Sequence, residues 1–405
     1  MNETMMVATE GRRETPREMT SRERVLAAVR GEPVDRVPVM YWLNPHATCR
    51  LVAEVQPGSQ PVVNLVAREL WRAFVRRGEF DAGEWTRLLP LLFEGYGNST
   101  YAVELGADIA ILSPELMSPV SFVTSLRRQE GRLTLRGPFG GTIGLGGIYA
   151  ELLETPVRDA RDLASYELPA VRPQHFDGIR RVRQRHPELC IAAEAMSLQQ
   201  ALCDFILGAE RFMLALYDHP AEIAAFLERL ADWVIGICRH LVSAGVDLIY
   251  LQDDYGATGR PLISMRMWRQ FTYPHLVRIV DAVHGNGGLF MLHSCGYQMP
   301  FLDDYVAAGI DVLQSFQPKA GNDFEAAYAE YGDRLAFATG IDTQRGESMA
   351  PEALREEILR NVKIGRRHGR YILSMTHMLQ PSMPMANVRA IFDTVREVQA
   401  GDHDL

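Results

Sequence analysis

The chain has 405 residues, of which 47% are hydrophobic and 23% are charged, the composition of an ordinary folded protein. Its 51 acidic and 42 basic residues give a net charge of −9, which argues against general nucleic-acid binding. No apolar run approaches the roughly 20 residues needed to cross a bilayer, so we expect no membrane span. The five cysteines are scattered and odd in number, which favours a reducing, cytoplasmic location.

The first structured element is predicted at residue 20. Residues 1–18 are polar and lack the apolar segment of a secretory signal, so we expect them to be a disordered leader. Thr20 and Glu23 have the spacing of a capping box that starts a helix, and Gly31 predicts where it ends. Residues 60–95 have the pattern of two amphipathic helices. A single domain is predicted over residues 19–400.

Strand-length apolar runs alternate with helical patterns along the rest of the chain. The helical patterns cover residues 221–244, 267–284 and 351–368. Continuous apolar strands alternating with amphipathic helices indicate a parallel sheet covered on both faces, and eight such units predict a (β/α)8 TIM barrel with an N-terminal helical extension. A doubly wound open sheet is the alternative, but no glycine fingerprint follows an early strand. The eight runs are Val39–Trp42, Asp108–Leu112, Ile191–Met196, Asp247–Leu251, Leu289–Leu292, Val312–Phe316, Leu335–Thr339 and Tyr371–Ser374.

One glycine-rich segment interrupts this alternation. Residues 133–147 contain six glycines whose spacing matches neither a dinucleotide fingerprint nor a phosphate loop. We expect a hairpin and a flexible loop over one end of the barrel.

Polar side chains follow the predicted strands, at the end of a barrel where active sites collect. Chemically reactive groups dominate this set, which predicts an enzyme. We assign substrate contacts to several of them. In chain order the set comprises Trp42, Asn44 and His46; Glu115; Glu194; Asp253 and Asp254; His293 and Cys295; Gln317; Asp342; and His377 with Gln380.

His293 and Cys295 are the most specific pair. Residues two apart on a strand point to the same face, so the imidazole and the thiolate converge. Both are good zinc ligands, and His377 at the end of the last strand is the candidate third ligand. The alternative is a buried cysteine beside a hydrogen-bonded histidine.

The Asp253–Asp254 doublet lies at the end of the neighbouring predicted strand. Either carboxylate can act as a general acid or base, hold His293 in place, or be a fourth metal ligand. Capping of the following helix is an equally good interpretation. Glu194 is a further candidate for acid–base chemistry, and carboxylates at such positions also cap loops.

Several segments resemble the uroporphyrinogen decarboxylase superfamily, in order from about Thr20 to Val398. The resemblance implies a (β/α)8 barrel, in agreement with the strand count. The segments are Ser21-Arg-Glu-Arg-Val-Leu-Ala-Ala-Val, Asp35-Arg-Val-Pro-Val, Glu154-Thr-Pro-Val-Arg-Asp-Ala, Ala244-Gly-Val-Asp-Leu-Ile, Asp253-Asp-Tyr-Gly, Leu292-His-Ser-Cys-Gly, Gly340-Ile-Asp-Thr-Gln and Tyr371-Ile-Leu-Ser.

The decarboxylases of this superfamily use no metal and bind a carboxylate-rich substrate through an arginine-rich loop after the first strand. Here the corresponding segment is Val39-Met-Tyr-Trp-Leu-Asn-Pro-His46, and the first arginine is Arg50. Their aspartate after the second strand is matched at best by Ser113-Pro-Glu115. Both departures argue against the decarboxylase reaction.

A second branch contains zinc methyltransferases that work with corrinoid proteins, such as the methylcobalamin:coenzyme M methyltransferases. Their motif is His-x-Cys, followed at the last strand by a second Cys. This chain keeps His293 and Cys295 and has His377 at the third place. Replacing a thiolate by an imidazole makes the metal complex less negative, which favours activation of an oxygen donor over a thiol.

The leading interpretation is therefore a zinc-dependent methyltransferase that exchanges a methyl group with a corrinoid. The donor or acceptor is a methoxy compound, an alcohol or a thiol. The chain lacks the Asp-x-His-x-x-Gly signature of corrinoid-carrying domains, so a partner protein has to supply the corrinoid (cobalamin). A metal-free decarboxylase and a non-catalytic tetrapyrrole- or small-ligand-binding barrel are the alternatives, and the sequence leaves a homodimer open.

Overall fold

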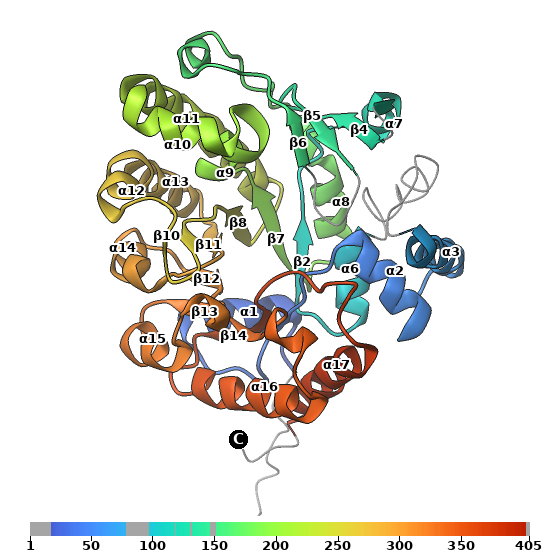
Figure 1. Cartoon of the computed structure of the whole chain (residues 1–405). Coiled ribbons are helices and arrows are strands. Elements are labelled where there is room, and N and C mark those ends of the chain that lie inside the picture. The colour runs from blue at the N-terminus through green and yellow to red at the C-terminus, as the bar shows by residue number, and fades with distance from the viewer. Residues whose placement is uncertain (1–17, 78–96, 118, 130–131, 146–150, 402–405) are drawn as a thin grey trace, which may run out of the picture.

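Eight parallel strands form the central sheet of the computed structural model, which describes residues 18–77, 97–117, 119–129, 132–145 and 151–401. Helices surround these strands (Figure 1), and the (β/α)8 TIM barrel is confirmed. In spatial order the strands are β1 (Val39–Met40), β14 (Tyr371–Met375), β13 (Ala336–Ile341), β12 (Val312–Ser315), β11 (Leu289–Ser294), β8 (Leu248–Gln252), β7 (Cys190–Ala195) and β2 (Ile109–Leu112). Each of the eight predicted runs contributes one strand.

The barrel closes between β1 and β2 through Asp108. The Asp108 amide donates to the Val39 carbonyl at 2.7 Å, and the Val39 amide donates to Asp108 Oδ2 at 2.9 Å. The same buried carboxylate accepts from Arg24 Nη1 at 2.7 Å and from Arg36 Nη1 at 2.8 Å. Strand β1 has only two residues, so it offers few backbone groups for pairing with β2. The Asp108 carboxylate adds a hydrogen bond between the two strands that a longer β1 would make through its backbone.

Helix α1 (Ser21–Arg30) closes the N-terminal end of the barrel. Its capping box is confirmed, with the Glu23 amide donating to Thr20 Oγ1 at 3.2 Å and the Thr20 amide donating to Glu23 Oε2 at 2.8 Å. Gly31 ends it in the left-handed conformation at φ 72°. Val25 and Val29 are buried against side chains inside the barrel, so the opposite, C-terminal end is the one left for a site.

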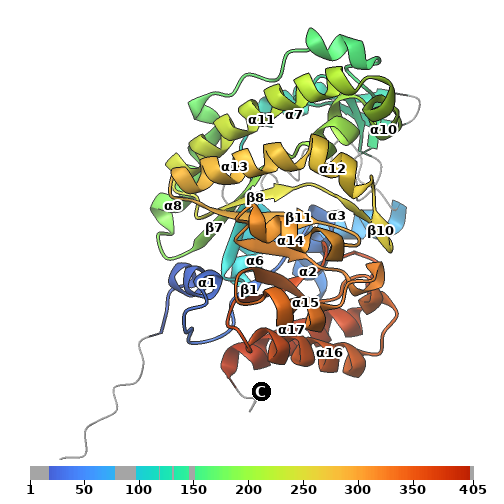
Figure 2. The same ribbon diagram turned by 90° about the vertical axis from the view of Figure 1, so that its left-hand side faces the viewer.

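The remaining helices include those that lie around the outside of the barrel, as the side view shows (Figure 2). They are α2 (Pro45–Glu54), α3 (Pro61–Arg77), α6 (Gly97–Glu104), α7 (Pro119–Ser125), α8 (Asp177–Arg185), α9 (Gln199–Ala201), α10 (Ala209–Asp218), α11 (Pro220–Ser243), α12 (Met265–Phe271), α13 (Tyr273–Gly285), α14 (Leu302–Ala307), α15 (Phe324–Tyr331), α16 (Pro351–Gly365) and α17 (Met385–Ala400). Short 3-10 turns are η1 (Ala160–Ala164), η2 (Pro173–Phe176), η4 (Met299–Phe301), η5 (Pro318–Ala320) and η6 (Arg345–Glu347), and η3 (Leu202–Ile206) is π-helical.

Two of the three predicted helical patterns are confirmed as single helices, α11 and α16. The pattern over 267–284 is also helical, but it is divided between α12, which ends at Phe271, and α13, which starts at Tyr273. Pro274 lacks an amide hydrogen and its ring clashes with the preceding turn, so the chain breaks there. The first predicted helix of residues 60–95 is α3, whereas residues 78–96 lie outside the described residues.

The glycine-rich segment is part of an antiparallel sheet of four strands, β3 (Leu126–Gln129), β4 (Arg132–Arg136), β5 (Thr142–Gly144) and β6 (Glu151–Glu154). The predicted hairpin is its central pair, β4 and β5. The outer strands were missed, since Leu126-Arg-Arg-Gln has a single apolar residue. A further small pair is β9 (Gly256–Ala257) with β10 (Arg260–Pro261).

The predicted leader and the predicted domain limits are not tested by the described residues. Residues 1–17 of the leader lie outside the described residues, and the domain limits of 19 and 400 stay predictions. Among the described residues, no helix combines the length and the apolar character that a membrane crossing requires.

Replacing Asp108 with alanine should lower the free energy of unfolding by about 3 kcal/mol, because it leaves buried guanidinium charge without its partner. The value lies at the low end for a broken buried pair since Arg24 keeps its ion pair with Asp35 at 2.6 Å. Urea unfolding measures the change. Asp393→Ala, which removes an exposed pair with Arg396, is the control and should cost less than about 1 kcal/mol. Equal effects of the two substitutions would contradict the role of Asp108.

Candidate metal centre

Three potential metal ligands meet at the C-terminal ends of β8 and β11. Cys295 Sγ lies 3.3 Å from His293 Nε2, and Asp254 Oδ1 lies 3.6 Å from the same nitrogen. One ligand atom from each of the three residues lies within 4.8 Å of the other two. We call Asp254, His293 and Cys295 the donor cluster.

The backbone of the two strand ends brings these residues together. In the parallel ladder His293 pairs with Gln252, and the Asp253 amide donates to the His293 carbonyl at 2.9 Å. Beyond the strands, Gly256 and Gly296 touch directly, since a Cβ added to Gly296 would lie 2.2 Å from the Gly256 carbonyl carbon. Gly296 also has φ 79°, which glycine adopts without strain. The glycine in each motif is therefore needed for the close approach of the two loops.

Hydrogen bonds set the tautomer of His293. Gln314 on β12 donates its Nε2 to the Met375 carbonyl at 2.9 Å, which leaves its Oε1 as the acceptor for His293 Nδ1. The buried Tyr250 hydroxyl donates to the same oxygen at 2.8 Å. His293 therefore carries its proton on Nδ1, and its bare Nε2 points toward Cys295 and Asp254.

The donor cluster fits a zinc ion by donor type and by spacing. Bonds of about 2.0–2.3 Å to a tetrahedral zinc place neighbouring donor atoms roughly 3.3–3.8 Å apart, a range that includes both measured distances. Burial, opposed by the Asp254 charge, lowers the pKa of His293, so its imidazole is neutral as ligation requires. Burial and Asp254 raise the pKa of the Cys295 thiol, and a bound cation would reverse that shift.

His377, predicted as the third ligand, lies outside the donor cluster. Its ring centroid is 6.2 Å from that of His293, and Trp42 packs against both rings at 4.8 Å and 5.0 Å. The physical reason is topological: β12 and β13 separate β14 from β11, whereas β8, which leads to Asp254, is the direct neighbour of β11. A role for His377 as an additional ligand stays a prediction.

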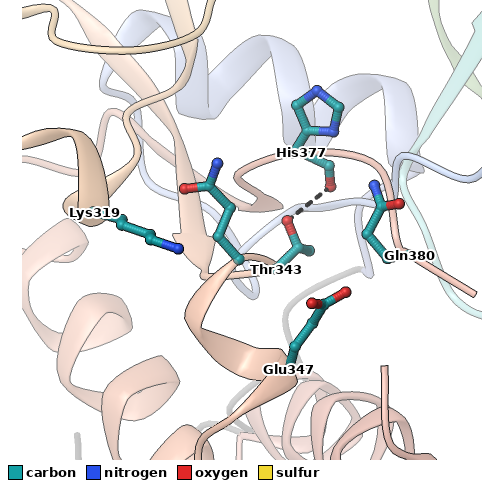
Figure 3. A pocket seen from close by; sticks show the side chains of 6 residues that line it. Lys319, Thr343, Glu347, His377 and Gln380 are labelled. Atoms are coloured by element: carbon teal, nitrogen blue, oxygen red, sulfur yellow. Dashed lines mark hydrogen bonds between the residues drawn. The ribbon is translucent and has the colours of Figure 1, made fainter. Parts of the chain in front are cut away.

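His377 and Gln380 line a cavity of about 260 Å³ (Figure 3). The cavity is also lined by Lys319, Thr343, Gln344 and Glu347, and the Thr343 hydroxyl donates to the His377 carbonyl at 3.4 Å. Burial and the neighbouring His293 lower the pKa of His377 to about 4, so this imidazole is neutral at physiological pH.

Asp253 makes the contacts of a helix cap. Its carboxylate accepts from the amides of Gln200 at 2.8 Å and of Leu198 and Gln199 at 3.2 Å, at the start of α9. The capped helix follows β7, not the strand that carries Asp253. Burial nevertheless raises the pKa of Asp253 to about 7, with the amide bonds opposing the shift. Its acid–base role stays a prediction.

Glu194 lines a second cavity, of about 240 Å³, beside the donor cluster. Gln252 donates to its Oε1 at 2.7 Å, and the Ser113 hydroxyl donates to its Oε2. Burial raises the pKa of Glu194 while these two bonds lower it. Glu115 is not among the residues that line this cavity; its amide donates to the His175 carbonyl at 2.8 Å, and burial and Asp177 raise its pKa.

Comparisons with known proteins identify the family. The model described as uroporphyrinogen decarboxylase (URO-D) matches residues 143–398. The chain belongs to the uroporphyrinogen decarboxylase family.

Two relatives named uroporphyrinogen decarboxylase illustrate the distance within the family. The protein from Anaeromyxobacter dehalogenans is 26% identical over 386 residues, covering 92% of this chain and 97% of the relative. The protein from Coxiella burnetii is 25% identical over 285 residues, covering 65% of this chain and 74% of its own length. A solved methyltransferase from Methanosarcina mazei has a TM-score of 0.64 at 20% identity, over 94% of this chain and 100% of that one, which supports the shared fold.

Three predicted substrate contacts of this family member have structural partners. Asn44 Oδ1 accepts from the Ala47 amide at 2.8 Å and caps α2. Gln317 Oε1 accepts from the Gly296 amide at 2.9 Å, which supports the loop of Cys295. Asp342 accepts from the Gln344 amide at 2.9 Å and pairs with Arg345. Substrate contact by these residues stays a prediction.

Two polar residues that orient His293, Gln314 and Tyr250, were not predicted from the sequence, because they lie inside apolar strand-length runs. A signal was present: Gln314 interrupts the buried run Val-Leu-Gln-Ser, and a buried amide needs partners.

Replacing Gln314 with leucine should weaken zinc binding about 10–100-fold, because His293 loses the acceptor that holds its Nδ1 proton. Competition with a chromophoric chelator measures the affinity. Gln399→Leu, which removes the hydrogen bond of an amide to the Gly106 carbonyl away from the mouth, is the control and should stay near wild type. Wild-type affinity in Gln314→Leu would show that His293 is oriented by something else.

The raised pKa of Glu194 predicts a pH dependence of stability. A carboxyl whose pKa is higher in the folded state contributes stability below its unfolded value of about 4.5, and this contribution is lost as pH rises through the folded pKa. In urea unfolding from pH 4.5 to 8, wild type should therefore lose stability more steeply than Glu194→Gln. Parallel curves for the two proteins would contradict the shift.

Proposed function

We propose that this chain is a zinc-dependent methyltransferase that moves a methyl group between a small molecule and a corrinoid carried by a partner protein. The observation that carries the proposal is the donor cluster, in which a buried imidazole turns its bare Nε2 toward a thiol and a carboxylate. A decarboxylase that uses no metal does not need three potential metal ligands this close together. The methyltransferase name of a fold neighbour is consistent with it.

His293 Nε2, Cys295 Sγ and the Asp254 carboxylate are the groups that would hold zinc. When bound, zinc supplies Lewis acidity to the oxygen or sulfur that loses or gains the methyl group. Gln314 and Tyr250 orient the imidazole, and Trp42 packs against it at 4.8 Å and shields it from water. Glu194, whose protonated form burial favours, is the group proposed to exchange a proton with a substrate oxygen.

Asp254 alters the charge argument made from the sequence. A thiolate and a carboxylate together carry the same formal charge as two thiolates, so a cluster of Asp254, His293 and Cys295 is as negative as the His-Cys-Cys set. A substrate thiol is then disfavoured only if His377 takes the place of Asp254. Methoxy compounds, alcohols and thiols all remain within the proposal.

A decarboxylase is the second candidate, favoured by the names of the relatives and by buried Asp253, whose pKa of about 7 suits a general acid. The scarcity of basic side chains around the two cavities argues against a decarboxylase. Of the residues lining the two described cavities beside the donor cluster, Lys319 is the one basic side chain apart from His377. A substrate with many carboxylates needs more countercharge than that.

Zinc analysis of the purified chain tests the proposal, with about one ion per chain expected. Cys295→Ala should lose both the metal and methyl transfer with methylcobalamin and a partner fraction, at little cost in stability, because the thiol sits at a strand end. Cys238→Ala, which removes a buried cysteine of α11, is the control. Retained zinc and activity in Cys295→Ala would overturn the methyltransferase proposal.

The same zinc analysis distinguishes the two candidates for the third ligand, Asp254 and His377. Asp254→Ala should lose zinc and His377→Ala should keep it, because Asp254 belongs to the donor cluster and His377 lies outside it. His377→Cys should also keep zinc, since sulfur suits this tolerant ion. Loss of zinc in His377→Ala with retention in Asp254→Ala would assign the ligand to His377.

A further inference from the structure

The cavity beside Glu194 has the shape and polarity of a substrate subsite. It lies at the mouth between β2, β7 and helix α11, and Gln252 connects it to the donor cluster. The Gln252 side chain donates to Glu194, and its backbone is the ladder partner of His293. A molecule in this cavity therefore lies one strand away from the donors.

The size of the cavity limits its occupant. Its volume of about 240 Å³ is below the roughly 300–1,000 Å³ of pockets for drug-sized ligands, so a single ring or a short chain fits. One side is apolar and offers van der Waals contact to such a body. It is formed by Pro114, Leu116, Met196, Phe205 and Ile237.

The polar part of the cavity lining consists of Ser113, Glu194, Ser197, Gln200 and Gln252. Among the lining residues that the structure describes there is no Arg, Lys or His. An anionic ligand would meet a carboxyl group without any compensating cation, at the cost of desolvating its own charge. The lining thus selects against carboxylates and sulfonates.

Ser197 points to a ligand with a hydrogen-bonding group. Its side chain is 1% exposed, it lines the cavity, and its hydroxyl has no hydrogen-bond partner among the described residues. Buried hydroxyl groups are normally paired with protein, water or ligand. A hydroxyl or ether oxygen of a bound molecule would satisfy it.

Resting on the function proposed above, we infer that this cavity binds the body of an uncharged methyl donor or acceptor, a one-ring phenol or its methyl ether. Glu194 and Ser197 are the polar contacts to the substrate oxygen. Leu116, a partly exposed residue of the cavity lining, limits the size of the ring that the cavity can hold.

Isothermal titration calorimetry with 2-methoxyphenol and with its carboxylated analogue 4-hydroxy-3-methoxybenzoate tests the inference. Wild type should bind the neutral probe at least tenfold more tightly than the charged one. Leu116→Trp fills the cavity and should weaken the neutral probe at least tenfold, while Leu214→Trp, on the exposed face of α10, is the matched control and should not. Leu116→Lys should reverse the preference toward the carboxylate.

Two outcomes would overturn the inference. One is a charged probe that binds wild type as tightly as the neutral probe, and the other is unchanged affinity in both Leu116 variants. Titration of Cys295→Ala separates this inference from the proposed function. Neutral-probe binding that persists without zinc supports the subsite whatever the reaction, whereas zinc binding and methyl transfer without neutral-probe binding would remove the subsite alone.

Discussion

The parallel register of β8 and β11 is the constraint on which the candidate site depends. Opposite residues in this ladder are Gln252 and His293, so the loops that leave the two strands run side by side. Gly256 and Gly296 then allow the loops to touch, and Asp254, His293 and Cys295 are placed within bonding reach of one ion. Every orienting contact, from Gln314 to Trp42, acts on side chains that this register has already brought together.

The rest of the barrel supports this edge without taking part in its chemistry. Asp108 closes the sheet on the far side, where β1 is too short to do so by backbone pairing alone. Helix α1 fills the N-terminal end with Val25 and Val29. The buried ion pairs of the closure seam and the packing of α1 lie at the N-terminal end of the barrel, whereas the C-terminal mouth carries buried acids and imidazoles with shifted pKa values.

Much of the fold could be predicted because buried parallel strands are read directly from apolar runs. All eight runs gave a strand, and the capping box at Thr20 gave the first helix. The outer strands β3 and β6 could not be predicted, since they are mostly exposed and half of their residues are charged. Within the site, His293 and Cys295 were predictable from their spacing. His377 was predicted as the third ligand from its place at the end of the last strand, and this role stays a prediction, whereas the order of the strands brings Asp254 beside His293 and Cys295.

The donor cluster also has a consequence for the order of events during folding. All three donors lie in one βαβ unit, from β8 through α12 and α13 to β11, so their contacts are local along the chain. Closing a short loop costs less chain entropy than pairing the chain's distant ends, which the β1–β14 contact requires. This unit can therefore assemble before the barrel has closed around it.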